Sequence, residues 1–171
     1  MKNTTDGLAP ELFGPQYVAR LETPLGRIWV ESDDERVLHV RFASPGRGRS
    51  GMPNVLKEAV RQLEQYFQGR RASFDLPLPE RGSAFRNRVW HQLQRIPFGR
   101  VKSYQELAQA AGGNARAVGG ACAANPLPIL VPCHRVLASN GSLTGYIGGL
   151  WRKRWLLEHE GVMPRELFPA S

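Results

Sequence analysis

Two neighbouring residues in the last third of the chain have the types needed for nucleophilic chemistry. Cys133 and His134 stand side by side in 128-PILVPCHRV-136, directly after Pro132. A thiol reacts as its thiolate, and a free cysteine with its usual pKa of about 8.5 is mostly protonated at neutral pH. A catalytic cysteine therefore needs a base, which a histidine can provide. The alternative is a buried thiol that only packs in the core.

Adjacency in the sequence does not by itself bring the thiol and the imidazole together. Neighbouring side chains point in different directions in a regular helix or strand. The prolines of 126-PLPILVP-132 indicate an irregular segment, in which a tight turn could bring the two side chains together. A base also needs a group that orients it. The segment 158-EHE-160 offers two carboxylates and an imidazole, and spacing leaves the choice among them open.

A metal site is the competing use of these residue types. Cys122, Cys133, His134 and His159 could together supply four zinc ligands. Zinc sites draw their ligands from short repeats such as CxxC or HxxxH, and neither spacing occurs in the chain. The sequence therefore predicts no metal site, and we interpret Cys122 as a small apolar filler.

Composition and charge narrow the kinds of partner. The 171 residues, 42% of them hydrophobic, suffice for one compact domain or two small ones. The formal net charge is +8, and arginines gather in 41–49, 81–102 and 152–154. Such a chain is typical of a polyanion binder, most often of nucleic acid, although a solvated basic surface fits equally well. A signal peptide and a membrane-length apolar run are both missing from the sequence, which predicts a cytoplasmic protein without membrane contact.

Residues 1–80 predict a small sheet with one helix, after a loose arm at 1–15. Short runs of β-branched and apolar residues, separated by turn residues, predict strands at 17–22, 26–31 and 37–42. A Gly/Pro/Arg-rich loop follows at 43–54, and one apolar face predicts a helix at 53–69. The proline-broken segment 74-FDLPLP-79 predicts a linker, so we expect domains at 1–80 and 81–171.

Residues 81–171 predict short helices, at 83–96, 103–112, 114–125 and 149–161. The second and third of these are joined by a tight Gly112-Gly113 turn, which is typical of a helix-turn-helix. Gly119 and Gly120 lie inside the third helix, where each costs roughly 1 kcal/mol relative to alanine. They indicate close approach to something large or, alternatively, close packing against another helix.

Together these segments resemble the O6-alkylguanine-DNA alkyltransferases, a family of DNA-repair proteins. The resemblance covers about residues 17 to 161, and PCHRV is its most specific motif. The other matching segments are 23-TPLG-26, 66-YFQG-69, 83-SAFRNRVW-90, 97-PFGRV-101, 103-SYQELA-108, 115-ARAVGGA-121, 125-NPLP-128, 145-GYIGG-149 and 153-KRWLLEHEG-161. The resemblance implies a mixed α/β fold, in which a small ribonuclease-H-like sheet domain precedes a helical domain with a helix-turn-helix.

The resemblance implies direct reversal of DNA damage. A damaged guanine would be flipped out of the duplex through the minor groove, and its O6-alkyl group would pass irreversibly to Cys133. O4 of thymine is a second expected target. Each molecule would act once, without a cofactor or a metal ion. We expect alkylated double-stranded DNA as the partner of a monomer, with cooperative binding along the DNA left open.

The resemblance also implies individual roles at the reacting centre. Cys133 would accept the alkyl group, His134 would take the thiol proton through a water, and Glu160 would orient that histidine. Asn125 would brace the active-site turn. The Tyr104 hydroxyl would assist the departing guanine, a kind of acid–base help that is worth roughly 10²–10⁴-fold.

The DNA contacts implied by the resemblance centre on the third helix. Arg116 would fill the gap that the flipped base leaves, and small side chains would let the helix enter a minor groove about 6 Å wide. The implied DNA-contacting set is Ser103, Tyr104, Ala115, Arg116, Ala117, Gly119 and Gly120. The base pocket would be lined by Arg135, Val136, Tyr146 and Ile147. Ile147 replaces the small or hydroxylated residue of many relatives, which predicts a narrower or more apolar pocket.

Other kinds of protein share part of this pattern. A non-catalytic alkyltransferase-like protein recognises damage but lacks the acceptor cysteine, so Cys133 argues against that class. A thiol hydrolase would not need the Ala/Gly-rich helix, and a basic helix-turn-helix regulator would not need the Cys–His pair.

Overall fold

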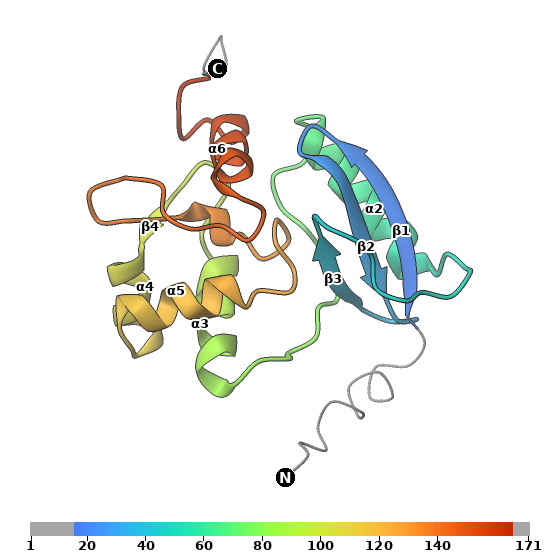
Figure 1. Cartoon of the computed structure of the whole chain (residues 1–171), viewed down its shortest axis with the longest axis horizontal. Coiled ribbons are helices and arrows are strands. Elements are labelled where there is room, and N and C mark those ends of the chain that lie inside the picture. The colour runs from blue at the N-terminus through green and yellow to red at the C-terminus, as the bar shows by residue number, and fades with distance from the viewer. Residues whose placement is uncertain (1–15, 166–171) are drawn as a thin grey trace. The chain divides into compact units, whose positions relative to one another are not determined.

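The computed structural model describes residues 16–165, so the loose arm predicted for 1–15 lies outside the described residues. The chain divides into two compact units, Met1–Pro79 and Glu80–Ser171 (Figure 1). The N-terminal unit holds an antiparallel sheet with a helix, and the C-terminal unit is mainly helical, as expected from the sequence. Among the described residues, no helix has the length and apolarity needed to cross a bilayer.

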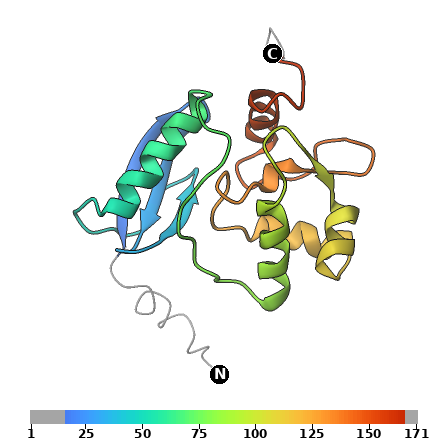
Figure 2. The ribbon, with the colours of Figure 1, turned by 180° about the vertical axis from the view of Figure 1, so that it is seen from behind.

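The N-terminal sheet has three antiparallel strands in the order β1-β2-β3. They are β1 (Tyr17–Thr23), β2 (Gly26–Ser32) and β3 (Val37–Arg41). Alternation along the strands places Leu21, Ile28 and Val30 in the core, all at most 6% exposed. Helix α2 (Asn54–Phe67) covers one face of the sheet, as Figures 1 and 2 show.

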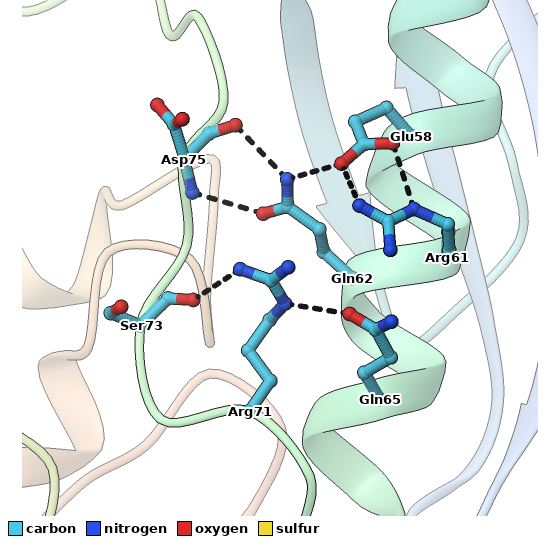
Figure 3. Close-up of polar contacts among 7 residues, drawn as sticks. All are labelled: Glu58, Arg61, Gln62, Gln65, Arg71, Ser73 and Asp75. Carbon is cyan, nitrogen blue, oxygen red and sulfur yellow. Dashed lines mark hydrogen bonds and ion pairs between the residues drawn. The ribbon is translucent and has the colours of Figure 1, made fainter.

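One polar residue interrupts the buried face of α2. Gln62 is 2% exposed, and its amide bonds both backbone groups of Asp75, accepting from N at 2.9 Å and donating to O at 3.1 Å (Figure 3). Arg71 forms a second link: its Nε donates to Gln65 Oε1 at 2.9 Å, and its Nη1 donates to the Ser73 carbonyl oxygen at 3.0 Å. These bonds fasten residues 71–75 to the helix, because buried polar groups are stable only when they are paired.

The C-terminal unit is a set of short elements. In chain order they are α3 (Ala84–Gln94), β4 (Lys102–Ser103), α4 (Tyr104–Ala111), α5 (Ala115–Ala123), the 3-10 helix η1 (Cys133–Arg135), β5 (Val136–Leu137) and α6 (Leu150–His159). Their starts follow local capping: Ser83 caps α3, Ser103 and Glu106 form a capping box on α4, and Asn114 caps α5. The sequence therefore predicted these helix starts correctly.

Helix α3 supports the pair α4 and α5. Arg88 Nε donates to the Ala111 carbonyl at 2.9 Å, and the buried Trp90 Nε1 donates to the Ala121 carbonyl at 2.9 Å. The short parallel pair β4–β5, which the sequence did not predict, joins Ser103 to Leu137. It places the start of α4 beside the segment that follows Cys133.

Candidate active site

Asn125 closes the backbone turn that carries Cys133. Asn125 is 1% exposed; its Nδ2 donates to the Val131 carbonyl at 2.8 Å, and its Oδ1 accepts from Leu127 N at 2.9 Å. Pro132 has φ −81° and ψ 67°, and Cys133 N donates to the Val131 carbonyl at 2.8 Å. These values describe an inverse γ-turn. The prolines thus shape an irregular segment, as the sequence predicted.

Ile129 within this turn has an unusual backbone. Its φ is +74°, the only positive value at a described non-glycine residue. A β-branched residue in this region costs on the order of 1–3 kcal/mol and persists only where the surroundings enforce it. Ile129 is 1% exposed, and Val131 N donates to the Leu127 carbonyl across it at 2.8 Å. Strained backbone of this kind clusters at functional sites.

His134 and Glu160 form a fully buried pair below the turn. His134 Nε2 lies 2.8 Å from Glu160 Oε1, and neither side chain is exposed. An ionised carboxylate only accepts hydrogen bonds, so Nε2 carries the proton and Nδ1 has the lone pair. Nδ1 has no hydrogen-bond partner among the described residues. Burial lowers the pKa of His134, against the influence of Glu160, so the ring is neutral and basic at Nδ1.

Arg135 completes the environment of Glu160. Its Nε and Nη2 donate to the two carboxylate oxygens, each at 2.8 Å, and its Nη1 donates to the Ile96 carbonyl at 2.6 Å. Burial alone would raise the pKa of Glu160, but the hydrogen bonds from His134 and Arg135 outweigh it and lower that pKa well below its usual value. Glu160 is therefore ionised across the physiological range.

Cys133 is 4% exposed, and burial raises the pKa of its thiol. A hydrogen bond from Asn125 and the positive charge of Lys153 act in the opposite direction. The resting thiol is protonated at neutral pH, so its reaction requires a base.

Lys153 is a site residue that the sequence analysis missed. It is 0% exposed, and its Nζ donates to the carbonyls of Thr144 and Gly145 at 3.1 and 3.2 Å. The same nitrogen lies 3.5 Å from the Tyr104 hydroxyl, which itself donates to the Thr144 carbonyl at 2.8 Å. Burial lowers the pKa of Lys153. Its position seven residues before Glu160, on the buried face of α6, was the available sequence signal.

A pocket of about 700 Å³ opens at Cys133. Tyr104, Tyr146 and Ile147 line it, with small residues of α5 and the loop 138–147. Ile147 is 53% exposed, so it stands at the rim and does not fill the pocket. Two of the expected lining residues do not line it. Arg135 instead pairs with Glu160, and Val136 is fully buried in β5.

Four small residues of α5 lie at the pocket or at the surface, whereas Ala121 is buried. Ala115 and Gly119 line the pocket, while Arg116, Ala117 and Gly120 are exposed. Apart from the neighbouring residues and the backbone of α5 itself, a Cβ added at Gly119 or Gly120 would meet no described atom within 4 Å. Packing against another described helix therefore does not account for these glycines.

The other residues of 158-EHE-160 point to different partners. Glu158 pairs with Arg154 at 2.9 Å, and His159 stacks on Trp155 with ring centroids 4.8 Å apart. Cys122 lines the pocket, where burial raises its pKa to about 12. The described residues contain no cluster of three or more His, Cys, Asp or Glu side chains able to hold a metal ion.

Profiles of one protein family match both units. The ribonuclease-like domain of 6-O-methylguanine DNA methyltransferase matches residues 17–79, and the DNA binding domain of the same family matches residues 84–162. The chain belongs to the 6-O-methylguanine DNA methyltransferase family. Family membership confirms the resemblance seen in the sequence.

Relatives in this family match over most of the chain. The methylated-DNA–protein-cysteine methyltransferase of Methanosarcina acetivorans is 42% identical over 154 residues, or 85% of this chain and 98% of that protein. The methyltransferase of the same name from Mycolicibacterium paratuberculosis is 44% identical over 158 residues, which are 88% of this chain and 93% of that protein. The crystal structure of Mycobacterium tuberculosis O6-methylguanine methyltransferase has a TM-score of 0.77 at 38% identity, covering 89% and 97%. The M. tuberculosis OGT structure in complex with DNA has a TM-score of 0.78 at 39% identity, covering 85% and 93%.

Proposed function

We propose that this protein repairs alkylated DNA by one irreversible transfer of an alkyl group, methyl in the simplest case, from O6 of guanine to Cys133. The observation that carries the proposal is the Cys133 thiol at the wall of a pocket, next in sequence to a buried histidine whose Nδ1 bonds none of the described residues. Relatives named methylated-DNA–protein-cysteine methyltransferase, and a relative in complex with DNA, support the substrate class.

The transfer is a displacement at an sp³ carbon. The Cys133 sulfur forms a bond to the alkyl carbon as the bond from that carbon to guanine O6 breaks. The thiol proton passes through a water to Nδ1 of His134, and Glu160 stabilises the imidazolium that forms. Because burial keeps the resting thiol protonated, proton removal accompanies the attack. The product thioether is stable, so each molecule acts once.

The leaving guanine departs as an anion unless a donor assists it. Tyr104 lines the pocket, and its hydroxyl donates to the Thr144 carbonyl and accepts from Lys153 Nζ. We propose that this single proton turns from the Thr144 carbonyl to the guanine when the base enters. A positioned donor of this kind contributes roughly 10²–10⁴-fold to rate. Lys153 holds the loop carbonyls and the hydroxyl together, so it positions Tyr104 in the pocket that Cys133 also lines.

Helix α5 is the surface proposed to contact DNA. Its exposed small residues permit close approach to a minor groove about 6 Å wide. Extrusion of a base costs a few kcal/mol. The exposed Arg116 is proposed to fill the resulting gap, since a guanidinium can stack and donate hydrogen bonds together. We propose that α4 and α5 act together as a helix-turn-helix and that Ser103, at the start of α4, also contacts the DNA.

The pocket rim bears on the adduct. Ile147 stands at the rim of the pocket, where its apolar side chain is proposed to meet the alkyl group as the base enters. We also propose that the protein removes alkyl groups from O4 of thymine, because the bond that breaks there is again one between an alkyl carbon and a base oxygen. The protein is proposed to act as a cytoplasmic monomer.

Intact mass spectrometry after incubation with an O6-methylguanine duplex tests the proposal. The expected result is a gain of one methyl group, mapped to the peptide that carries Cys133. Cys133→Ala should bind the duplex and gain no mass, whereas Cys122→Ala, the matched thiol control, should gain the methyl group. An unchanged wild-type mass with tight binding would indicate a protein that only recognises damage.

A further inference from the structure

The loop between β3 and α2 alternates glycine and arginine at residues 46 to 49. Gly46 and Gly48 face the protein. A Cβ at Gly46 would lie 2.9 Å from Glu31 Oε1, and one at Gly48 would lie 2.3 Å from Val18 Cγ2. Neither glycine has a positive φ, so each is required by lack of space and not by backbone conformation. We call residues 46–49 the arginine segment.

The arginine segment is fastened at both ends. Gly46 N donates to Glu31 Oε1 at 2.6 Å, and Arg49 N donates to the Gln16 carbonyl at 2.8 Å. Arg49 also forms a parallel bridge with Tyr17, at the free edge of strand β1. The backbone of this loop is therefore held in place on the sheet.

The two arginines alternate with these glycines along the chain, at the surface of the N-terminal unit. Both are exposed, and neither guanidinium pairs with another described residue. By contrast, the exposed Arg20 and Arg27 both approach Glu22, at 3.7 and 2.8 Å.

We propose that the arginine segment binds two phosphates of duplex DNA, as a nucleic-acid contact of the N-terminal unit that is separate from α5. The choice of DNA as the polyanion rests on the proposed function. A guanidinium fork matches two phosphate oxygens, which favours phosphate over a single carboxylate. Because the backbone is already held, little ordering of the loop opposes binding.

The test measures, by fluorescence anisotropy, how binding to an undamaged duplex depends on salt concentration. Each phosphate contact contributes about 0.9 to the slope of log affinity against log salt. Arg47→Ala/Arg49→Ala should therefore reduce the slope by about 1.8, so that its affinity deficit is about tenfold larger at 50 mM than at 200 mM salt. Arg47→Lys/Arg49→Lys should retain most of the slope.

The matched control is Arg20→Ala/Arg27→Ala, which removes the same charge from the same unit. It should change the slope much less, because those guanidiniums already approach Glu22. Equal slopes in the two double variants, or no change in either, would overturn the proposal. A third outcome would also overturn it: Arg47→Ala/Arg49→Ala binds phosphatidylserine vesicles less well but keeps the wild-type slope on duplex DNA. That result would assign the segment to membrane surfaces.

Methyl transfer is measured separately, at saturating duplex and low salt. The control Arg20→Ala/Arg27→Ala should then transfer at the wild-type rate, because neither of its residues belongs to the proposed DNA contact. A wild-type protein without transfer would refute the proposed function. The salt slopes would still be readable in that case, since they use undamaged DNA and require no chemistry.

Discussion

Each unit of the protein buries a glutamate between a histidine and an arginine. In the N-terminal unit, Glu31 Oε2 lies 2.9 Å from His39 Nδ1, and Glu31 Oε1 accepts from Arg41 Nε at 2.8 Å. In the C-terminal unit, Glu160 has the corresponding contacts with His134 and Arg135, each at 2.8 Å. The same three residue types thus form two clusters with different surroundings.

The two clusters differ in what lies around the carboxylate. Glu31 has a further partner, the backbone N–H of Gly46, so its cluster holds a loop. Its arginine side chain, that of Arg41, is 40% exposed, whereas that of Arg135 is 7% exposed. His134 is fully buried, its Nδ1 has no hydrogen-bond partner in residues 16–165, and it is next in sequence to a thiol. Residue types alone therefore do not decide whether such a cluster anchors backbone or supports chemistry.

The largest expected difference between the clusters is in the rate of methyl transfer. His134→Gln removes the proposed base, so the single-turnover rate should fall by roughly 10²–10⁴-fold. His39→Gln, the matched change in the other cluster, should leave that rate unaltered. Quenched-flow mass spectrometry on an O6-methylguanine duplex measures both. A similar loss in both variants would mean that the histidines act only through stability.

Glu160→Gln should give the next largest effect, on stability. Removing the charge leaves the buried Arg135 without its carboxylate, and a broken buried pair costs about 3–5 kcal/mol. Urea unfolding followed by circular dichroism measures the free energy. Glu158→Gln is the control, because its partly exposed pair with Arg154 is worth about 0–1 kcal/mol. If Glu160→Gln lowered the free energy of unfolding by less than Glu158→Gln does, the buried pairing of Glu160 would be contradicted.

Glu31→Gln should lower the free energy of unfolding by about 1–3 kcal/mol, which is less than the same change at Glu160. The half-exposed Arg41 can still be solvated by water, and the Gly46 N–H can still donate to the neutral amide oxygen of the glutamine. Hydrogen bonds lower the pKa of Glu31 to about 2, although burial alone would raise it. The wild type therefore gains stability from Glu31 above its usual pKa of 4.5 and loses it as pH falls toward 2. Acid unfolding of Glu31→Gln should lack this loss, and identical acid curves would contradict it.

The smallest expected effect concerns the transfer rate near neutral pH. Burial lowers the pKa of His134 below its usual 6.5, so the ring stays neutral and the rate should vary little from pH 8 to 6.5. The rate should fall only at lower pH, as protonation removes the base. A rate that already halves above pH 6.5 would mean that the pKa is raised instead.

Local signals made much of the fold predictable. The caps Ser83, Ser103 and Asn114 act within one turn of their own helix, so the helix starts could be predicted from neighbouring residues. The pair β4–β5 could not, because two-residue strands have no pattern and pair only after distant segments meet. The buried face of α2 was predicted apart from Gln62, whose partner at Asp75 lies across a turn.

The sequence by itself determined the reactive types, the Cys133–His134 pair, the prolines around it and the alternation of glycine and arginine at 46–49. Only the tertiary structure decided which charged groups share a carboxylate. Resemblance singled out Glu160, but the partnership of Arg135 and the buried position of Lys153 emerge only when α6, η1 and the loop at 144–145 come together. A buried charge is stable only beside its partner, and that partner is set by distance in space, not by spacing along the chain.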